Sequence, residues 1–151
     1  MGIAVKAELL SLCRDFIEEK SSTLQSEYSI YRESAANETK STAGDKHDTS
    51  KSMMQLEQEK LGKQLAELQR QKKIVSGIDP LKVCSRVEFG CVIETDNGNF
   101  FMSVAAKEFV LNNKTYLAIS MQSPLGAAML NKRVNEDVVY NTKRYKILSI
   151  Y

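Results

Sequence analysis

The stretch "STAGDKHDTSK" (Ser41–Lys51) joins two long segments in which apolar residues recur every seven positions. It contains Gly44 and two aspartates three residues apart, Asp45 and Asp48. Glycine, aspartate, serine and threonine favour turns and the first residues of helices. We therefore expect the chain to turn back on itself here, with the tip of an antiparallel two-helix hairpin near residues 42–49.

The seven-residue repeat on both sides of this turn predicts a coiled coil. The repeated positions hold apolar or aromatic residues: Leu10, Ile17, Leu24 and Tyr31 before the turn, and Met54, Leu61, Leu68 and Val75 after it. An apolar stripe that persists for three or four heptads is typical of paired helices. Each arm has about 30 residues and would extend about 45 Å at 1.5 Å per residue. The sequence thus predicts a helical hairpin over residues 1–77.

A different pattern begins after Ser76–Pro80, where glycine and proline interrupt the helical repeat. Alternation of apolar and polar residues beyond this break is typical of strands. The expected strands are residues 84–95, 100–104, 114–121, 137–140 and 144–151, with "DNGN" (96–99) as a hairpin turn. Ser123 as N-cap and Pro124 at the first helical position predict one short helix. Residues 81–151 are therefore expected to form a small antiparallel-sheet domain, which makes the fold class α+β.

Composition narrows the functional classes. The net charge of +2 is too small to indicate nucleic-acid binding by bulk electrostatics. A membrane-spanning run of about 18 apolar residues is missing, and the first residues lack the pattern of a signal peptide, so we expect a cytoplasmic protein. Cys13, Cys84 and Cys91 form no C-x-x-C pair and are odd in number, which favours buried thiols in a reducing cytosol over a disulfide framework or a zinc site.

Two segments of the second half carry a more specific pattern. They are "SPLGAAMLNKRVNEDVVY" (123–140) and the C-terminal "YKILSIY", and "VEFGCVIET" (87–95) precedes them. Behind a long helical hairpin, this combination resembles the Gre family of bacterial transcription elongation factors, GreA and GreB. The matching positions are Ser123, Pro124, Leu125, Gly126, Ala127, Leu130, Lys132, Asp137 and Val138. The resemblance implies an FKBP-like C-terminal domain.

The resemblance extends to the expected hairpin tip. The family carries Gly-Asp-x-x-Glu there, and Gly44 and Asp45 match it, while Asp48 stands at the glutamate position as a shorter acid. Family members insert the tip into the secondary channel of RNA polymerase, where the acids help to hold a second Mg²⁺ and position the attacking water. The resemblance therefore implies that Asp45 and Asp48 act in trans on a Mg²⁺ shared with the polymerase.

The same resemblance implies the partners and excludes independent catalysis. RNA polymerase would be the direct partner, contacted through Gly44 and through Ser123, Pro124 and Leu125. Nascent RNA would be reached only indirectly. The chain would be a monomer with no cofactor of its own and no membrane contact, and it would stimulate the nuclease activity of the polymerase rather than act as an enzyme itself.

Other interpretations of the tip stay open. Asp45 and Asp48 also suit the start of a helix, where an N-cap and an acid near the positive end of the helix dipole are favoured. Residues 49–52 are Thr-Ser-Lys-Ser where the family has Asn-Ala-Glu-Tyr, and Lys51 reverses a charge. Lys51 would oppose cation binding or pair with Asp48. A channel-binding regulator without cleavage activity, or a coiled-coil adaptor for a different partner, are the alternatives.

Overall fold

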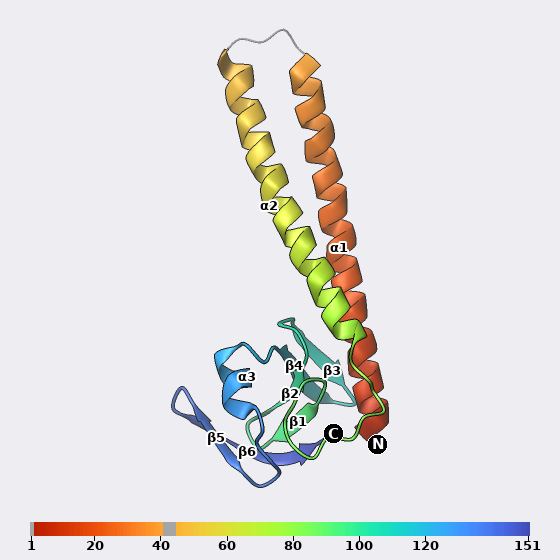
Figure 1. The fold of residues 1–151 in the computed structure, drawn as a ribbon, viewed down its shortest axis with the longest axis vertical. Coiled ribbons are helices and arrows are strands. Elements are labelled where there is room, and N and C mark those ends of the chain that lie inside the picture. Colours follow the sequence, from red (N-terminus) through yellow and green to blue (C-terminus); the bar gives the residue numbers. More distant parts are fainter. Residues whose placement is uncertain (1, 41–44) are drawn as a thin grey trace. The chain divides into compact units, whose positions relative to one another are not determined.

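The chain forms two long helices followed by strands and one short helix, so the predicted α+β class is confirmed (Figure 1). This computed structural model describes the backbone of residues 2–40 and 45–151 and the side chains of residues 2–34 and 51–151. The elements are α1 (Gly2–Lys40), α2 (Asp45–Ser76), β1 (Val92–Thr95), β2 (Gly98–Met102), β3 (Glu108–Leu111), β4 (Lys114–Ile119), α3 (Pro124–Met129), β5 (Asp137–Tyr140) and β6 (Lys143–Ile150).

The chain divides into two compact units, which we name by their main features. The hairpin unit is Ile17–Lys72, and the head unit combines Met1–Phe16 with Lys73–Tyr151. Within the described residues, no helix is long and apolar enough to cross a lipid bilayer.

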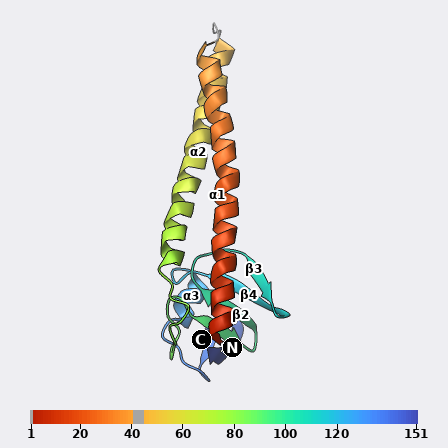
Figure 2. The same ribbon diagram turned by 90° about the vertical axis from the view of Figure 1, so that its right-hand side faces the viewer.

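In the hairpin unit, α1 and α2 run side by side in opposite directions (Figure 2). Ile17, Leu61 and Leu68 are buried, and the other heptad residues of this unit, Leu24, Tyr31 and Met54, are half-buried. The burial thus follows the seven-residue repeat, as the sequence predicts. A Lys72–Glu18 ion pair links the two helices.

The head unit contains one six-stranded sheet with the order β3-β4-β2-β1-β6-β5. The expectation of a purely antiparallel sheet is wrong, because β2 and β4 pair in parallel, with Phe100 opposite Leu117. The short strand β3 was not expected from the sequence. It forms a hairpin with β4 through Asn112 and Asn113, which both have positive φ. After β2 the chain first forms β3 at the edge of the sheet and then turns back into β4. Strand β4 therefore lies between β3 and β2 and runs in the same direction as β2.

A second correction concerns the strand expected over residues 84–95, of which only β1 (Val92–Thr95) forms. The backbone of Val87 bonds to Lys132, in the connection between α3 and β5, instead of to a neighbouring strand. Gly90 adopts a φ of 89°, which side chains rarely allow. Residues 84–91 therefore form a loop, held in place by tertiary contacts.

Both faces of the sheet are covered within the head unit. One face carries the cluster shared with α3, formed by Cys84, Val87, Cys91, Ile93, Phe100, Met102, Ile119, Met129, Val138, Tyr145 and Ile147. The part of α1 in the head unit contacts the sheet region: Cys13 Sγ lies 3.9 Å from Ser103 Oγ, directly after β2, and the rings of Phe16 and Phe109 on β3 pack edge to face with centroids 6.3 Å apart. The sequence-based boundary at residues 77–81 assigned these turns to the hairpin, whereas the compact head also includes residues 1–16 and 73–80.

Candidate functional site

The backbone places the two tip aspartates at the beginning of α2. This helix starts at Asp45, so Asp48 follows within its first turn, three residues later. Residues three apart are neighbours on a helix surface, and the predicted sharing of one Mg²⁺ by the two aspartates depends on this spacing. Gly44 and the side chains of Asp45 and Asp48 lie outside the described residues. Their roles in holding Mg²⁺ and contacting a partner stay predictions.

The short helix α3 begins as the sequence predicts. Ser123 is its N-cap: its Oγ accepts a hydrogen bond from the Gly126 N–H at 3.1 Å and donates one to the Ser120 carbonyl at 2.7 Å. Pro124 occupies the first helical position and is exposed, whereas Leu125 packs partly against the core. These residues therefore build the start of α3, and their predicted contact with a partner stays a prediction.

A nearly buried carboxylate, Glu94 on β1, forms the centre of a polar network that sequence reasoning missed. Its residue is 8% exposed, Lys114 Nζ lies 2.7 Å from its Oε2, and the Tyr151 hydroxyl donates to its Oε1. Burial alone would raise the pKa of Glu94, but the hydrogen bonds from Lys114 and Tyr151 and the Lys114 charge lower it below its ordinary value. Lys114 and Tyr151 are 20 and 57 residues away from Glu94 in sequence, so no local sequence pattern indicates these contacts.

This network predicts a loss of stability in acid. A glutamate whose folded pKa lies below the unfolded value of about 4.3 stabilises the fold above that pH, and this contribution is lost as the pH falls through the folded pKa. We expect the free energy of unfolding of the wild type, measured by urea titration, to fall between about pH 5 and pH 3. Glu94→Gln should flatten part of this slope, whereas Glu108→Gln, at an exposed position on β3, should leave it unchanged. Equal slopes in the wild type and Glu94→Gln would contradict the assignment.

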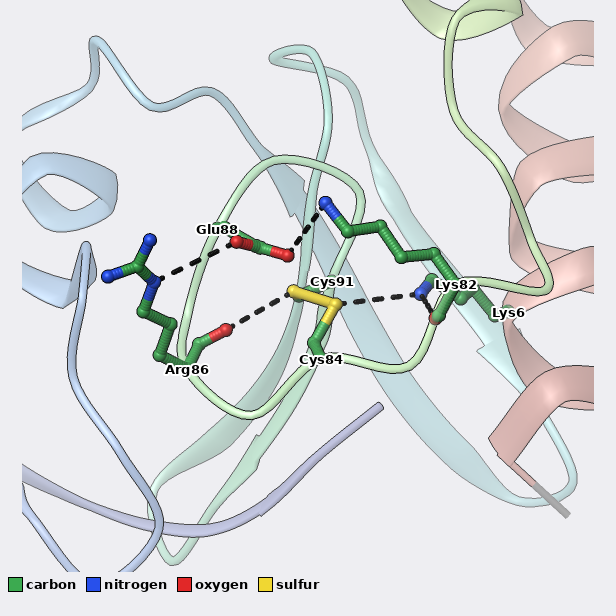
Figure 3. The surroundings of a disulfide bond; sticks show 6 residues. All are labelled: Lys6, Lys82, Cys84, Arg86, Glu88 and Cys91. Atoms are coloured by element: carbon green, nitrogen blue, oxygen red, sulfur yellow. Dashed lines mark hydrogen bonds and ion pairs between the residues drawn. A yellow bond between two sulfur atoms is a disulfide. The ribbon is translucent and has the colours of Figure 1, made fainter.

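The cysteines differ from the sequence-based expectation. Cys84 and Cys91 form a disulfide with a Cα–Cα distance of 6.3 Å, and only Cys13 is a free, buried thiol (Figure 3). The expectation of three thiols is therefore wrong. A spacing of seven residues matches no common cysteine motif, and only the loop conformation of residues 84–91 brings the two Cα atoms within disulfide range.

Charged side chains surround this disulfide. Lys6 of α1 is buried, and its Nζ donates to the Lys82 carbonyl at 2.6 Å and lies 3.7 Å from Cys84 Sγ. Burial lowers the pKa of the Lys6 ammonium. Glu88 pairs with Lys82 Nζ at 2.9 Å, and this hydrogen bond lowers the pKa of the Glu88 carboxyl.

Glu88 also completes a group of metal-ligating type with the two sulfurs. Among the described residues, Cys84, Glu88 and Cys91 are the one such group, with ligand atoms within 4.8 Å of one another. Both sulfurs are bonded to each other, and the carboxylate is already paired with Lys82. In the disulfide state the group thus offers no free thiolate to a metal.

Basic side chains on α2 are partly neutralised within the hairpin unit. Arg70 makes two hydrogen bonds to the Glu67 carboxylate, at 2.9 and 2.6 Å, and Lys72 pairs with Glu18 of α1. Exposed pairs of this kind contribute little to stability. They reduce the positive charge that this part of α2 presents to an anionic partner.

Comparison with known proteins concerns mainly the head. Residues 82–151 match the family model of the transcription elongation factor GreA/GreB C-terminal domain. A solved structure of the transcription factor Gfh1 is similar to this chain with 17% identity and a TM-score of 0.32, over 99% of this chain and 93% of that one. Among curated proteins, none matches the sequence. The match includes the Ser123 helix start and every strand described above, and it relates this part of the chain to the C-terminal domain of the GreA/GreB transcription elongation factors.

Proposed function

We propose that this chain binds bacterial RNA polymerase and inserts its hairpin tip into the secondary channel, where the tip supports cleavage of backtracked RNA. The observation that carries the proposal is a GreA/GreB C-terminal domain in a chain whose preceding residues form two long paired helices. The 32 residues of α2 extend about 48 Å at 1.5 Å per residue. A slender helical pair of this length suits a deep and narrow channel.

The donor set at the start of α2 fits the ion that such cleavage needs. Mg²⁺ prefers oxygen ligands and is commonly bound by one or two carboxylates together with water. Asp45 and Asp48 supply two carboxylates within one helical turn, and they would hold the ion jointly with the polymerase. A bound Mg²⁺ stabilises negative charge on a phosphodiester and activates water. The chain alone would catalyse nothing, and its own residues would only bind, orient and complete the partner's site.

The second candidate is a regulator that occupies the channel without stimulating cleavage. Lys51, a half-exposed residue of α2, follows Asp48 by three positions, so the two are neighbours on the helix. A lysine ammonium at that distance competes with a cation for the Asp48 carboxylate. Among the departures from the family pattern, the charge reversal at Lys51 is the observation that supports the regulator as the second candidate, and it can be tested directly.

The deciding experiment uses purified polymerase stalled in backtracked elongation complexes, with RNA length followed on denaturing gels. We expect the wild-type chain to accelerate shortening of the RNA from its 3′ end. Asp45→Ala and Asp48→Ala should each slow the accelerated reaction at least about tenfold, because each removes one of the two metal ligands. Asp15→Ala, at an exposed position of α1 in the head unit, is the matched control and should behave as the wild type.

Other results would favour the alternatives. Protection of the RNA from shortening, relieved by Lys51→Glu, would support the channel-binding regulator. Lack of binding to the polymerase in any state would contradict both proposals and leave the coiled-coil adaptor. A change of gel-filtration mass with concentration would then show whether the hairpin pairs with a second copy.

A further inference from the structure

We propose that Cys84 and Cys91 are a reversible thiol–disulfide pair, a redox-modification site in which Lys6 stabilises the reduced form. The site lies wholly in the head unit, at the loop between α2 and β1 (Figure 3). It is independent of the proposed cleavage function, and each of the two can fail without the other.

Each sulfur faces the partner that its reduced form would use. Cys84 Sγ lies 3.7 Å from Lys6 Nζ. A thiolate accepts a hydrogen bond from an ammonium group far more strongly than a disulfide sulfur does. Cys91 Sγ lies 3.5 Å from the Arg86 carbonyl, which accepts a hydrogen bond only from a donor. A disulfide sulfur carries no proton, whereas a Cys91 thiol can donate to this oxygen. The surroundings therefore suit a Cys84 thiolate beside a Cys91 thiol.

The local charges favour the thiolate as well. Three cations and one carboxylate surround the pair, namely Lys6, Lys82, Arg86 and Glu88, and the Asp79 carboxylate acts on the Lys6 charge. Glu88 is engaged by Lys82 at 2.9 Å and by Arg86 at 3.9 Å, so its charge is largely compensated. Lys6, by contrast, is only 1% exposed, and its charge acts on Cys84 with little screening by solvent. Cations beside a cysteine lower its pKa and stabilise the thiolate.

The reaction needs a dithiol as reductant. One thiolate of the reductant first attacks one sulfur of the pair, so that a mixed disulfide forms and the Cys84–Cys91 bond breaks. The second thiol of the reductant then attacks its own sulfur in the mixed disulfide, which closes a disulfide on the reductant and releases the protein sulfur. Two electrons pass to the pair. Of the two reductant protons, one remains on Cys91 as a thiol, and the other is released to solvent when Cys84 stays a thiolate beside Lys6. Oxidation by a disulfide of the same class reverses each change.

Access to the sulfurs requires a local opening. Cys84 and Cys91 are both buried, so an external thiolate cannot reach them in the closed loop. The segment before them has no helix or strand, and the side chains of Leu81 and Val83 are exposed. Opening of a single segment costs less than global unfolding, even where it breaks the tertiary contacts of residues 84–91. We therefore expect exchange without unfolding of the head.

The first test is reversibility in the folded chain. Cys13→Ala removes the third thiol, so that labelling reports the pair alone. The protein is equilibrated with mixtures of reduced and oxidised dithiothreitol, quenched in acid and labelled with a maleimide of high mass. We expect complete reduction and complete reoxidation to follow the same curve of labelled fraction against the ratio of reduced to oxidised dithiothreitol, with unchanged circular dichroism.

Resistance to the dithiol until the chain unfolds in urea would overturn the proposal. One tightly held zinc ion per reduced chain that blocks reoxidation would also overturn it, because Glu88 and the sulfurs would then form a metal site.

The second test is the role of Lys6. In a chain with Cys13→Ala and Cys91→Ala, thiolate absorbance near 240 nm against pH measures the pKa of Cys84. We expect Lys6→Met to raise this pKa by about one unit, a tenfold loss of thiolate at neutral pH, and Lys6→Arg to restore it. Lys63→Met, at an exposed position of α2, is the matched control and should change nothing.

An unchanged pKa of Cys84 in Lys6→Met would overturn the assignment. If Lys6→Met does not fold, the chain that retains Lys6 is compared in its native and urea-unfolded states, and equal values would overturn it equally.

Discussion

Gly126→Ala is expected to destabilise the head by about 3 kcal/mol or more, at the upper end of what overpacking a core costs. A Cβ on Gly126 would lie 2.0 Å from the Ser120 carbonyl oxygen and 2.8 Å from Ser123 Oγ. Neither atom can move away cheaply, because the same carbonyl accepts hydrogen bonds from the backbone and the hydroxyl of Ser123. The cost therefore arises from a close backbone approach that the N-cap of α3 imposes.

The free energy of unfolding of Gly126→Ala is measured by urea titration followed by circular dichroism. Gly62→Ala is the matched control, since a Cβ there would have one neighbour, a Tyr28 ring carbon at 3.8 Å. In the middle of α2 this change should stabilise the helix by about 0.5–1 kcal/mol. If the free energy of unfolding of Gly126→Ala lies within about 0.5 kcal/mol of the wild-type value, the start of α3 can relax around the added Cβ, and the predicted steric conflict is contradicted.

Phe101→Ala is the second substitution with a large expected effect, about 3–5 kcal/mol, which is the usual range for removing a buried aromatic side chain. Phe101 on β2 is fully buried but lies outside the cluster that packs with α3. Its neighbours across the sheet are Val92 on β1 and Ala118 on β4. It therefore belongs to the opposite face of the sheet from the cluster that packs with α3.

Urea titration again measures the loss of stability, with Val110→Ala as control because Val110 on β3 is 70% exposed. That control should stay within about 0.5 kcal/mol of the wild type. Hydrogen exchange adds a test of the packing, since Phe101→Ala should also reduce amide protection around Leu9 and Cys13 of α1. Unaltered protection there would show that α1 does not depend on this face of the sheet.

Local sequence patterns were sufficient for the helices and for several turns. The heptad positions Ile17, Leu61 and Leu68 are buried as expected, because a helix repeats its contacts every few residues and the pattern is visible in any short window. The start of α3 at Ser123 and Pro124 is equally local, since the cap bonds groups three residues apart. The resemblance to the GreA/GreB family also rests on such short segments.

Other features depend on residues that only the folded chain brings together. The parallel pairing of β2 with β4, the Glu94 network with Lys114 and Tyr151, and the Cys84–Cys91 bridge beside Lys6 each join positions between 7 and 78 residues apart. A single chain without its fold offers many possible partners for each of these groups. The heptad repeat likewise could not indicate that residues 2–16 of α1 pack against the sheet. Periodicity reports which face of a helix is apolar, whereas the surface that covers this face is selected by the packing of the whole domain.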